Sequence, residues 1–402
     1  MSPRPEIEGE SVMGWPDRKR VRAYPKKDQQ GRVVLVRTPF WDMQGLITPT
    51  DLRYVIIQME PCEPVHPDDW SLSVSGEVNH PLQFNFEEIR KLPAKTVRCV
   101  TECSGHETEL WNYSRNGGPK PDRYSCDGVY SGLASSGEWV GVPLATVLKK
   151  AGLRPNAVSV RAEGFDRGNP RGEALTYTDE SAATEMNYDK CLPLEKALDP
   201  DTLLAWALNS EYLRHVHGAP LRLIVPGWSG HWSVKWLQKL EVLDHMAPCF
   251  FQTQFYFYAR SPEDPDRKLI TTMGVKSFIT DPRDSDSPIP CGSHMVRGLA
   301  WSGCGAITRV EVSFDQGHTW HDAHMEEPRE KWLWARWSYL WDVKKPGKYS
   351  IIARAADEAG RVQPQTEWNF LNFNFDGIVP VDIEVRANCK ATAERRSVEV
   401  SI

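Results

Sequence analysis

In the first half of the chain, short segments with an apolar residue at every second position alternate with short segments whose apolar residues have helical spacing. In WSLSVSGEV, Leu72 and Val74 fall on one side of an extended segment, which predicts a half-buried strand. The apolar positions of FNFEEIRKLP have helical spacing up to Pro93, and those of GVPLATVLKKAGL have it between Pro143 and Gly152. Because no regular βαβ repeat connects these segments, the pattern favours an α+β fold.

The second half of the chain has an almost pure strand pattern. RVEVSFDQGHTW alternates Val310, Val312 and Phe314 before an Asp-Gln-Gly turn, and WLWARWSYLWDV and YSIIARAADEAG continue the alternation. Short strands separated by turn signals predict a β-sandwich of about 120 residues. The many aromatic side chains of this part are expected in its core or at an interface.

These changes of pattern divide the chain into three parts. Residues 1–38 are polar and rich in Pro, Lys and Arg, and we expect an arm without its own core. Residues 39–258 form the mixed domain. The Pro-, Asp- and Arg-rich stretch ARSPEDPDRK marks a boundary, and residues 265–390 form the all-β domain.

Composition narrows the function classes. The 402 residues include 40% apolar and 25% charged residues, an ordinary globular mixture, and the net charge of −6 disfavours a nucleic-acid partner. No apolar run reaches the length of a membrane span. The N-terminus lacks the apolar segment of an export signal, so we expect a cytoplasmic protein, or a periplasmic one whose leader was removed or whose export a partner assists. The nine cysteines lack framework spacing, which indicates reduced thiols.

The stretch VRCVTECSGHETELW holds the first candidate for chemistry. Val97, Cys99 and Val100 indicate a strand, and Cys103 follows at its end, directly before polar residues and a glycine. A cysteine in this place is either a small buried apolar residue or a thiol at a strand tip that a ligand can approach.

Two other chemistries remain open at this point. A zinc site would use Cys99, Cys103 and His106, but structural zinc needs four ligands and no second Cys/His pair with suitable spacing follows. A serine hydrolase would use Ser229 in PGWSGHW, but the nucleophile elbow needs G-x-S-x-G and His231 stands at its last position.

Several motifs in order resemble the sulfite oxidase family of molybdenum enzymes. They are Cys-Ser-Gly at 103–105, WVGVPLATVLKKAG at 139–152, HGAPLRLIVPGW at 217–228 and VKWL at 234–237. VRGLAWSG and RVEVSFDQGHTW resemble the family's dimerisation domain, which is an immunoglobulin-like sandwich. The resemblance covers roughly residues 40 to 385 and implies a molybdopterin-binding catalytic domain over 39–258 and a dimerisation domain over 265–390.

The resemblance also assigns roles to single residues. The Cys103 thiolate would be the one protein ligand of molybdenum, a soft donor that suits such a metal. His217, Arg222 and Lys235 match cofactor-binding positions, and Asp166 matches a position near the cofactor. The further candidates for cofactor binding in the glycine-rich loop are Ser229 and His231. The catalytic tyrosine of the family falls on Tyr256, with Tyr258 as a rival.

The chain departs from the family pattern at two places. Ile56, Ile57 and Gln58 stand where sulfite oxidases have Arg-Asn-His, and His106 and Glu107 stand where they have Asn-Arg. The lost guanidinium groups weaken the binding of a small dianion. The cations that could replace them lie in two loops: Arg115, Lys120, Arg123, Arg167 and Arg171. The ECSG form is closer to the sulfane dehydrogenase branch of the family.

Together these observations predict a molybdopterin-dependent oxidoreductase that oxidises a small or carrier-bound sulfur compound by oxygen transfer at molybdenum. The chain has no haem or iron–sulfur motif, so a separate acceptor, by resemblance of the cytochrome c type, would take the electrons, and the protein would be a homodimer. The alternatives are a family member that reduces an oxide, a non-catalytic member, and a zinc or serine hydrolase.

Overall fold

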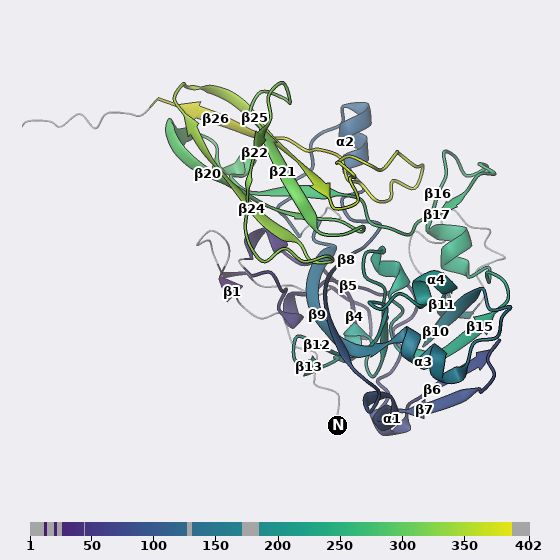
Figure 1. Cartoon of the computed structure of the whole chain (residues 1–402). Coiled ribbons are helices and arrows are strands. Elements are labelled where there is room, and N and C mark those ends of the chain that lie inside the picture. The colour runs from purple at the N-terminus through teal and green to yellow at the C-terminus, as the bar shows by residue number, and fades with distance from the viewer. Residues whose placement is uncertain are drawn as a thin grey trace, which may run out of the picture.

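A computed structural model of the protein describes residues 12–13, 20–21, 26–43, 45–126, 131–170 and 185–387. Figure 1 shows a purple-to-teal lobe built from the first part of the chain and a green-to-yellow lobe built from the last part.

The first lobe contains a five-stranded sheet in the order β11-β10-β15-β6-β7. Its strands are β6 (Ser71–Gly76), β7 (Leu82–Asn85), β10 (Ser159–Gly168), β11 (Met186–Pro193) and β15 (Leu237–Leu243). All neighbours are antiparallel except β15 and β6. The predicted alternation in β6 is confirmed, because Leu72 and Val74 are both buried in the core of this lobe.

A second sheet holds the segment that ends at Cys103. It has the order β13-β12-β9-β8, and β14 pairs with β12. Its strands are β8 (Lys95–Glu102), β9 (Ala134–Pro143), β12 (Leu203–Leu208), β13 (Glu211–Tyr212) and β14 (Arg222–Ile224). The pairing of β8 with β9 continues to Glu102 opposite Ala134. Cys103 therefore follows the last paired residue of β8.

Smaller sheets complete the first lobe. Strands β3 (Lys26–Lys27), β4 (Val33–Val36) and β5 (Val55–Ile56) form a three-stranded sheet, so part of the segment predicted as a polar arm lies in a sheet. Two further pairs are β1 (Val12–Met13) with β2 (Arg20–Val21) and β16 (Phe257–Tyr258) with β17 (Lys268–Leu269).

Four short α-helices occur in the described residues: α1 (Phe86–Arg90), α2 (Leu110–Asn116), α3 (Leu144–Ala151) and α4 (Leu194–Ala197). The two predicted helices are confirmed: a capping box of Asn85 and Glu88 begins α1, and α3 lies between Pro143 and Gly152, whose φ is +70°. The α+β prediction overstated helix, since the longest described helix has eight residues and strands dominate. No described helix is long and apolar enough to cross a membrane.

The second lobe is all β, as predicted, with two sheets around one apolar core. The first sheet contains β18 (Lys276–Asp281), β20 (Gly292–Trp301), β24 (Ala335–Val343) and β23 (His324–Met325). The second contains β19 (Ile289–Pro290), β26 (Val381–Arg386), β25 (Gly347–Asp357), β21 (Ile307–Ser313) and β22 (His321–Asp322). Val310, Val312 and Trp337 are among the buried side chains of this core.

The two lobes share an apolar cluster next to the end of β8. It joins Val100 of β8 to Phe278 and Trp301 of the second lobe. The helix after Cys103 also contacts the second lobe, since the rings of Trp111 and Phe375 meet edge to face at 5.1 Å, and Figure 1 shows α2 beside that lobe. The segment around Cys103 is thus held from both lobes.

Candidate active site

Cys103 occupies the turn that directly follows β8. Its amide donates a hydrogen bond to the carbonyl of Leu133 at 2.9 Å, and the Gly105 amide donates one to Sγ at 3.4 Å. Burial raises the pKa of the Cys103 thiol to about 12, although the Gly105 amide opposes the shift. A further positive centre is therefore needed before a thiolate can exist here.

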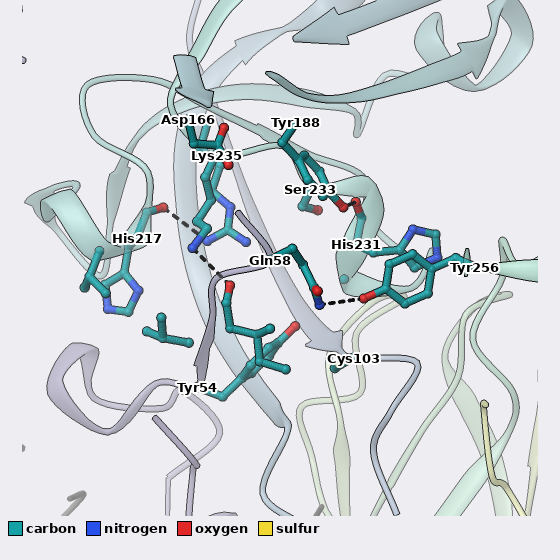
Figure 2. A pocket seen from close by; sticks show the side chains of 15 residues that line it. Tyr54, Gln58, Cys103, Asp166, Tyr188, His217, His231, Ser233, Lys235 and Tyr256 are labelled. Carbon is teal, nitrogen blue, oxygen red and sulfur yellow. Dashed lines mark hydrogen bonds between the residues drawn. The ribbon is translucent and has the colours of Figure 1, made fainter. Parts of the chain in front are cut away.

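The thiol faces a cavity that opens to solvent, with about 610 Å³ of empty space when the open mouth is included. Figure 2 shows Cys103 below the cavity, His217 and Lys235 at one end, and His231 and Tyr256 at the other. Seven of the eight predicted site residues line the cavity: Cys103, Asp166, His217, Arg222, His231, Lys235 and Tyr256. The fold thus brings together residues that are far apart in the sequence.

Buried cations gather at one end of the cavity. Arg222 Nη1 donates to the carbonyl of His217 at 3.1 Å, while its Nε has no hydrogen-bond partner among the described residues. Burial, followed by the charge of Arg53, lowers the pKa of Arg222 to about 9. Lys235 Nζ donates to the carbonyl of Ile56 at 3.1 Å. The buried guanidinium groups of Arg222 and Arg53, together with Lys235, favour the binding of an anion at this end of the cavity.

Gly218 allows this cluster to be compact. Its φ of +102° belongs to the left-handed region, and a Cβ added there would lie 2.9 Å from Cβ of Lys235. The His-Gly pair at 217–218 therefore permits the close approach of the lysine that faces the cavity.

Asp166 of β10 adds an acidic group to the same end. Burial raises its pKa to about 7, although Lys235 acts in the opposite direction. Its Oδ1 is buried and has no hydrogen-bond partner among the described residues. This oxygen is available to a ligand with N–H groups.

Tyr256 stands at the other end of the cavity and is fixed from two sides. Gln58 Nε2 donates to its phenol oxygen at 2.7 Å, and the His231 ring stacks on its ring with centroids 4.0 Å apart and planes 2° apart. Tyr258 points elsewhere, because its hydroxyl accepts a hydrogen bond from Asn374 Nδ2 at 2.6 Å and it lines a different cleft. Of the two tyrosines, Tyr256 is the one that shares a cavity with Cys103.

Comparison with known protein families supplies the identity of this arrangement. Residues 59–251 match the model of the oxidoreductase molybdopterin binding domain, and residues 267–379 match the model of the Mo-co oxidoreductase dimerisation domain. The chain belongs to the sulfite oxidase family. Its cofactor is molybdopterin, and the resemblance stated from the motifs is confirmed.

Similar proteins within and around the family differ in their named activities. The chain is 30% identical over 346 residues to mitochondrial sulfite oxidase of Rattus norvegicus, covering 81% of this chain and 59% of that protein. It is 31% identical over 334 residues to the NADH nitrate reductase of Ulva prolifera, covering 75% of this chain and 36% of that protein. It therefore spans only part of the length of these relatives.

A solved structure with the same fold is the sulfane dehydrogenase SoxCD from Paracoccus pantotrophus. It superposes with a TM-score of 0.74 and 29% identity, covering 90% of this chain and 88% of that chain. The fold of the sulfite oxidase family is therefore present along nearly the whole chain.

The side chains that line the cavity match the phosphate, the ring and the metal of molybdopterin. Molybdopterin has an anionic phosphate, and the cavity has two cations, the buried Arg222 with an unpartnered guanidinium nitrogen and the partly buried Lys235. Its ring has N–H donors, which the free oxygen of Asp166 can accept. A metal ion at Cys103 would supply the positive centre that the sulfur needs before it can ionise.

Ser229 is the predicted site residue that the structure keeps out of the cavity lining. Its Oγ lies 2.6 Å from Oγ of Ser104 and donates to the carbonyl of Glu102 at 3.3 Å. Its hydroxyl supports the turn that holds Cys103. Because Ser229 has these partners and not His231, the hydrolase alternative lacks its nucleophile–base pair.

The zinc alternative also lacks a geometric basis. Cys99 lies in the apolar cluster with Trp139 and Leu203, whereas Cys103 faces the cavity. Within the described parts of the chain, no three His, Cys, Asp or Glu side chains are grouped so that they could hold a metal ion. The ligand set of a structural zinc site is therefore not assembled by these residues.

The loop cations that the structure describes, which were expected to replace the missing family arginine, do not line the cavity. Arg123 makes a bidentate pair with Glu107 at 2.7 and 3.0 Å, and Lys120 binds Asp284 and Asp382. Arg115 lies over the Trp368 ring, and Arg167 pairs with Glu185 at 2.9 Å. Arg171 lies outside the described residues. The prediction that Arg115, Lys120, Arg123 or Arg167 lines the pocket is wrong, because these side chains bind other partners.

A buried ionic network behind Cys103 includes His106 and Glu107, the residues that stand in place of the family's Asn-Arg pair. Lys276 Nζ lies 2.6 Å from Glu102 and 3.9 Å from Glu107, and Trp301 Nε1 donates to Glu102 at 2.8 Å. Burial opposes ionisation of Glu107, but Arg123, His106 and Lys276 lower its pKa to about 2. Lys276 and Trp301 belong to the second lobe, so the network ties the Cys103 turn to that lobe.

We expect Lys276→Met to lower the free energy of unfolding by about 3–5 kcal/mol, because Glu102 would keep a buried charge without its ammonium partner. Urea denaturation followed by tryptophan fluorescence measures the change. The double variant Lys276→Met/Glu102→Gln should recover part of the loss. An unchanged midpoint in the single variant would contradict the role of this network.

Sequence reasoning missed several residues at the cavity, among them Tyr54, Tyr188 and Ser233. It did identify Gln58, but as a departure from the family pattern and not as the partner of Tyr256. Arg53 was also missed, although it is fully buried and donates to the carbonyl of Ser136 at 3.0 Å. The signal that could have found Arg53 is a charged residue next to the apolar run after Leu52.

Proposed function

We propose that this protein is a molybdopterin-dependent oxidoreductase that oxidises a sulfur compound of the sulfite or sulfane type and passes the electrons to a separate acceptor. The observation that carries this proposal is the Cys103 thiol facing a cavity with the cations Arg222 and Lys235 at one end and Tyr256 at the other. Sulfite oxidases and a sulfane dehydrogenase among the similar proteins support a sulfur substrate.

The residues at the cationic end would hold the cofactor. Arg222 and Lys235 would neutralise its phosphate, Asp166 would accept from its ring nitrogens, and Cys103 would bind the metal through sulfur. When bound, molybdenum supplies two-electron redox chemistry and the exchange of an oxygen atom with the substrate.

Tyr256 is suited to manage a proton at the reacting end. Because Gln58 donates to the phenol oxygen, the phenol hydrogen is free to point at a group in the cavity. Burial, together with the proximity of Cys103, raises the pKa of Tyr256 well above its usual value. The phenol therefore remains a hydrogen-bond donor at neutral pH and can stabilise an oxygen that gains negative charge.

We expect Tyr256→Phe to lower kcat by about 100-fold, because the variant loses this donor. Steady-state kinetics with an artificial one-electron acceptor measures the change. Tyr258→Phe is the matched control, since Tyr258 binds Asn374 away from the cavity, and its kcat should stay within about two-fold. Equal losses in the two variants would remove Tyr256 from the mechanism.

The test of the proposed function is an anaerobic substrate panel with ferricyanide as acceptor. We expect turnover with sulfite or with a compound that has a terminal sulfane sulfur. Since a nitrate reductase is also among the relatives, nitrate with a reduced viologen dye belongs in the panel. Nitrate reduction without sulfur oxidation would replace this proposal by the second candidate, an oxide reductase.

We also infer that the second lobe is an immunoglobulin-like sandwich that joins two copies of the chain. The match to the dimerisation domain and the two sheets around one core support this inference. The acceptor would be a cytochrome c-type protein, as the resemblance to the sulfite oxidase family implies. Light scattering of the purified protein distinguishes a dimer from a monomer.

A further inference from the structure

Lys190 of β11 is a fully buried lysine next to the reacting end of the cavity. Its ammonium has no hydrogen-bond partner among the described residues. A buried ammonium without a partner is costly, so its retention calls for a compensating interaction.

Three aromatic rings surround the ammonium of Lys190. Its Nζ lies 5.0 Å from the ring centroid of Tyr256, 5.4 Å from that of Trp232 and 5.7 Å from that of Tyr188. These distances are within the range of cation–π attraction. Tyr188 and Tyr256 also line the cavity, so Lys190 lies directly behind the cavity wall.

The acidic group nearest in sequence does not neutralise Lys190. Asp189 binds Arg161, with Nε at 2.7 Å and Nη2 at 2.6 Å from Oδ2. Burial lowers the pKa of Lys190 to about 7, while the nearby Cys249 and Asp189 raise it. The neighbouring His231 is uncharged, since burial and then Lys190 keep its pKa well below the usual value.

Among the residues that the structure describes, those that line the cavity at this end carry no positive charge. The cations that line the cavity, Arg222 and Lys235, lie at the cofactor end, and Figure 2 shows Lys235 and His217 opposite His231 and Tyr256. Ile56 and Gln58, which also line the cavity, are uncharged. In the described structure, Lys190 is the cation in contact with the aromatic wall made by Tyr188 and Tyr256.

We propose that Lys190 is an electrostatic positioning residue that acts through Tyr256 and Tyr188 and draws an anionic sulfur oxyanion or terminal sulfur to the reacting end of the cavity. This inference rests on the proposed function and names its substrate class. A unit charge placed behind one layer of side chains changes the affinity for an anion by about ten-fold or more at the effective dielectric of a protein.

The test compares Lys190→Met with Lys190→Arg in the purified holoprotein. We expect Lys190→Met to raise KM for the anionic sulfur substrate about ten-fold with kcat within about three-fold, and Lys190→Arg to keep KM near the wild-type value. Equilibrium dialysis with radiolabelled sulfate supplies a readout that needs no turnover, and Lys190→Met should weaken sulfate binding by the same factor. If Lys190 had a purely structural role, its variants would lower kcat and cofactor content. The size of the effect would then not depend on whether residue 190 carries a charge.

The matched control is Lys196→Met. Lys196 of α4 also lies beside two tryptophan rings, Trp228 at 5.7 Å and Trp332 at 5.4 Å, but it binds Asp199 and does not line the cavity. Its KM and sulfate affinity should equal those of the wild type. If Lys190→Met does not fold, Lys190→Gln serves the same comparison.

Two results would overturn the inference: a wild-type holoprotein that binds no sulfate, or neutral Lys190 variants that bind it as tightly as the wild type. Failure of the proposed function has a different signature. A protein that binds sulfate in a Lys190-dependent way but oxidises no sulfur compound would retain the anion site and lose the assigned reaction.

Discussion

Cys103→Ser should lower turnover by at least about 10³-fold. The variant protein should still fold and should still bind the pterin. A loss of this size corresponds to about 4 kcal/mol of transition-state stabilisation. A serine oxygen is a harder and much less acidic donor than a thiolate, so the metal would lose the soft ligand that the turn after β8 presents. Because Cys103 borders a cavity, the free energy of unfolding should change by only about 1 kcal/mol.

The matched control is Cys304→Ser in the second lobe, whose cysteine is also a partly exposed free thiol and does not line the cavity. Its turnover should equal that of the wild type. Molybdenum K-edge absorption would count the sulfur neighbours of the metal in both variants, with one fewer in Cys103→Ser. An unchanged sulfur count and retained turnover in Cys103→Ser would remove this residue from the metal site.

Arg222→Met should have opposite effects on the empty and the loaded protein. In cofactor-free protein it removes a buried guanidinium whose Nε has no partner among the described residues, so the free energy of unfolding should rise by about 1 kcal/mol or more. In the loaded protein the same change removes a charge-assisted contact to an anion, and cofactor binding should weaken by about 2–5 kcal/mol.

Arg283→Met is the control for the general effect of losing a buried arginine. Arg283 donates to the carbonyl of Trp41 at 3.0 Å and binds Asp42, so its partners all belong to the protein. This variant should be destabilised and should keep its pterin content. Thermal unfolding of cofactor-free protein and pterin fluorescence of purified protein measure the two effects. If Arg222→Met behaves like Arg283→Met in both, the guanidinium has only a structural role.

Patterns of a few neighbouring residues predicted the helix ends and the strands, because these features depend mainly on nearby residues. Pro143 and Gly152 bound α3 as expected, because proline suits a helix start and Gly152 adopts a positive φ. The period-two pattern around Val310 and Val312 predicted a strand whose buried side is set by alternation. The position of Cys103 after β8 followed from the same reasoning, since polar residues and Gly105 end the apolar run.

The pairings that complete the site depend on tertiary structure and left little trace in the sequence. Gln58 and Tyr256 are 198 residues apart, and Lys276 and Glu102 are 174 apart, so neither contact follows from a local pattern. The same limit explains the error about Arg123, because its partner Glu107 becomes visible only in the folded chain.

The choice between Tyr256 and Tyr258 shows why periodicity alone was insufficient. Two residues apart in a strand, both would point to one face. The chain instead leaves a π-helical turn over Phe251–Phe255, and Tyr256, with φ −94° and ψ 74°, precedes β16. This irregular backbone sends the two phenols into different clefts.

Anomalous diffraction at the molybdenum edge from crystals of the purified protein would locate the metal. We predict one anomalous peak per chain at bonding distance from Cys103 Sγ, with pterin density reaching Arg222 and Lys235. A peak elsewhere in the molecule, or a cavity at Cys103 without metal and pterin in crystals of protein that contains molybdenum, would contradict this account.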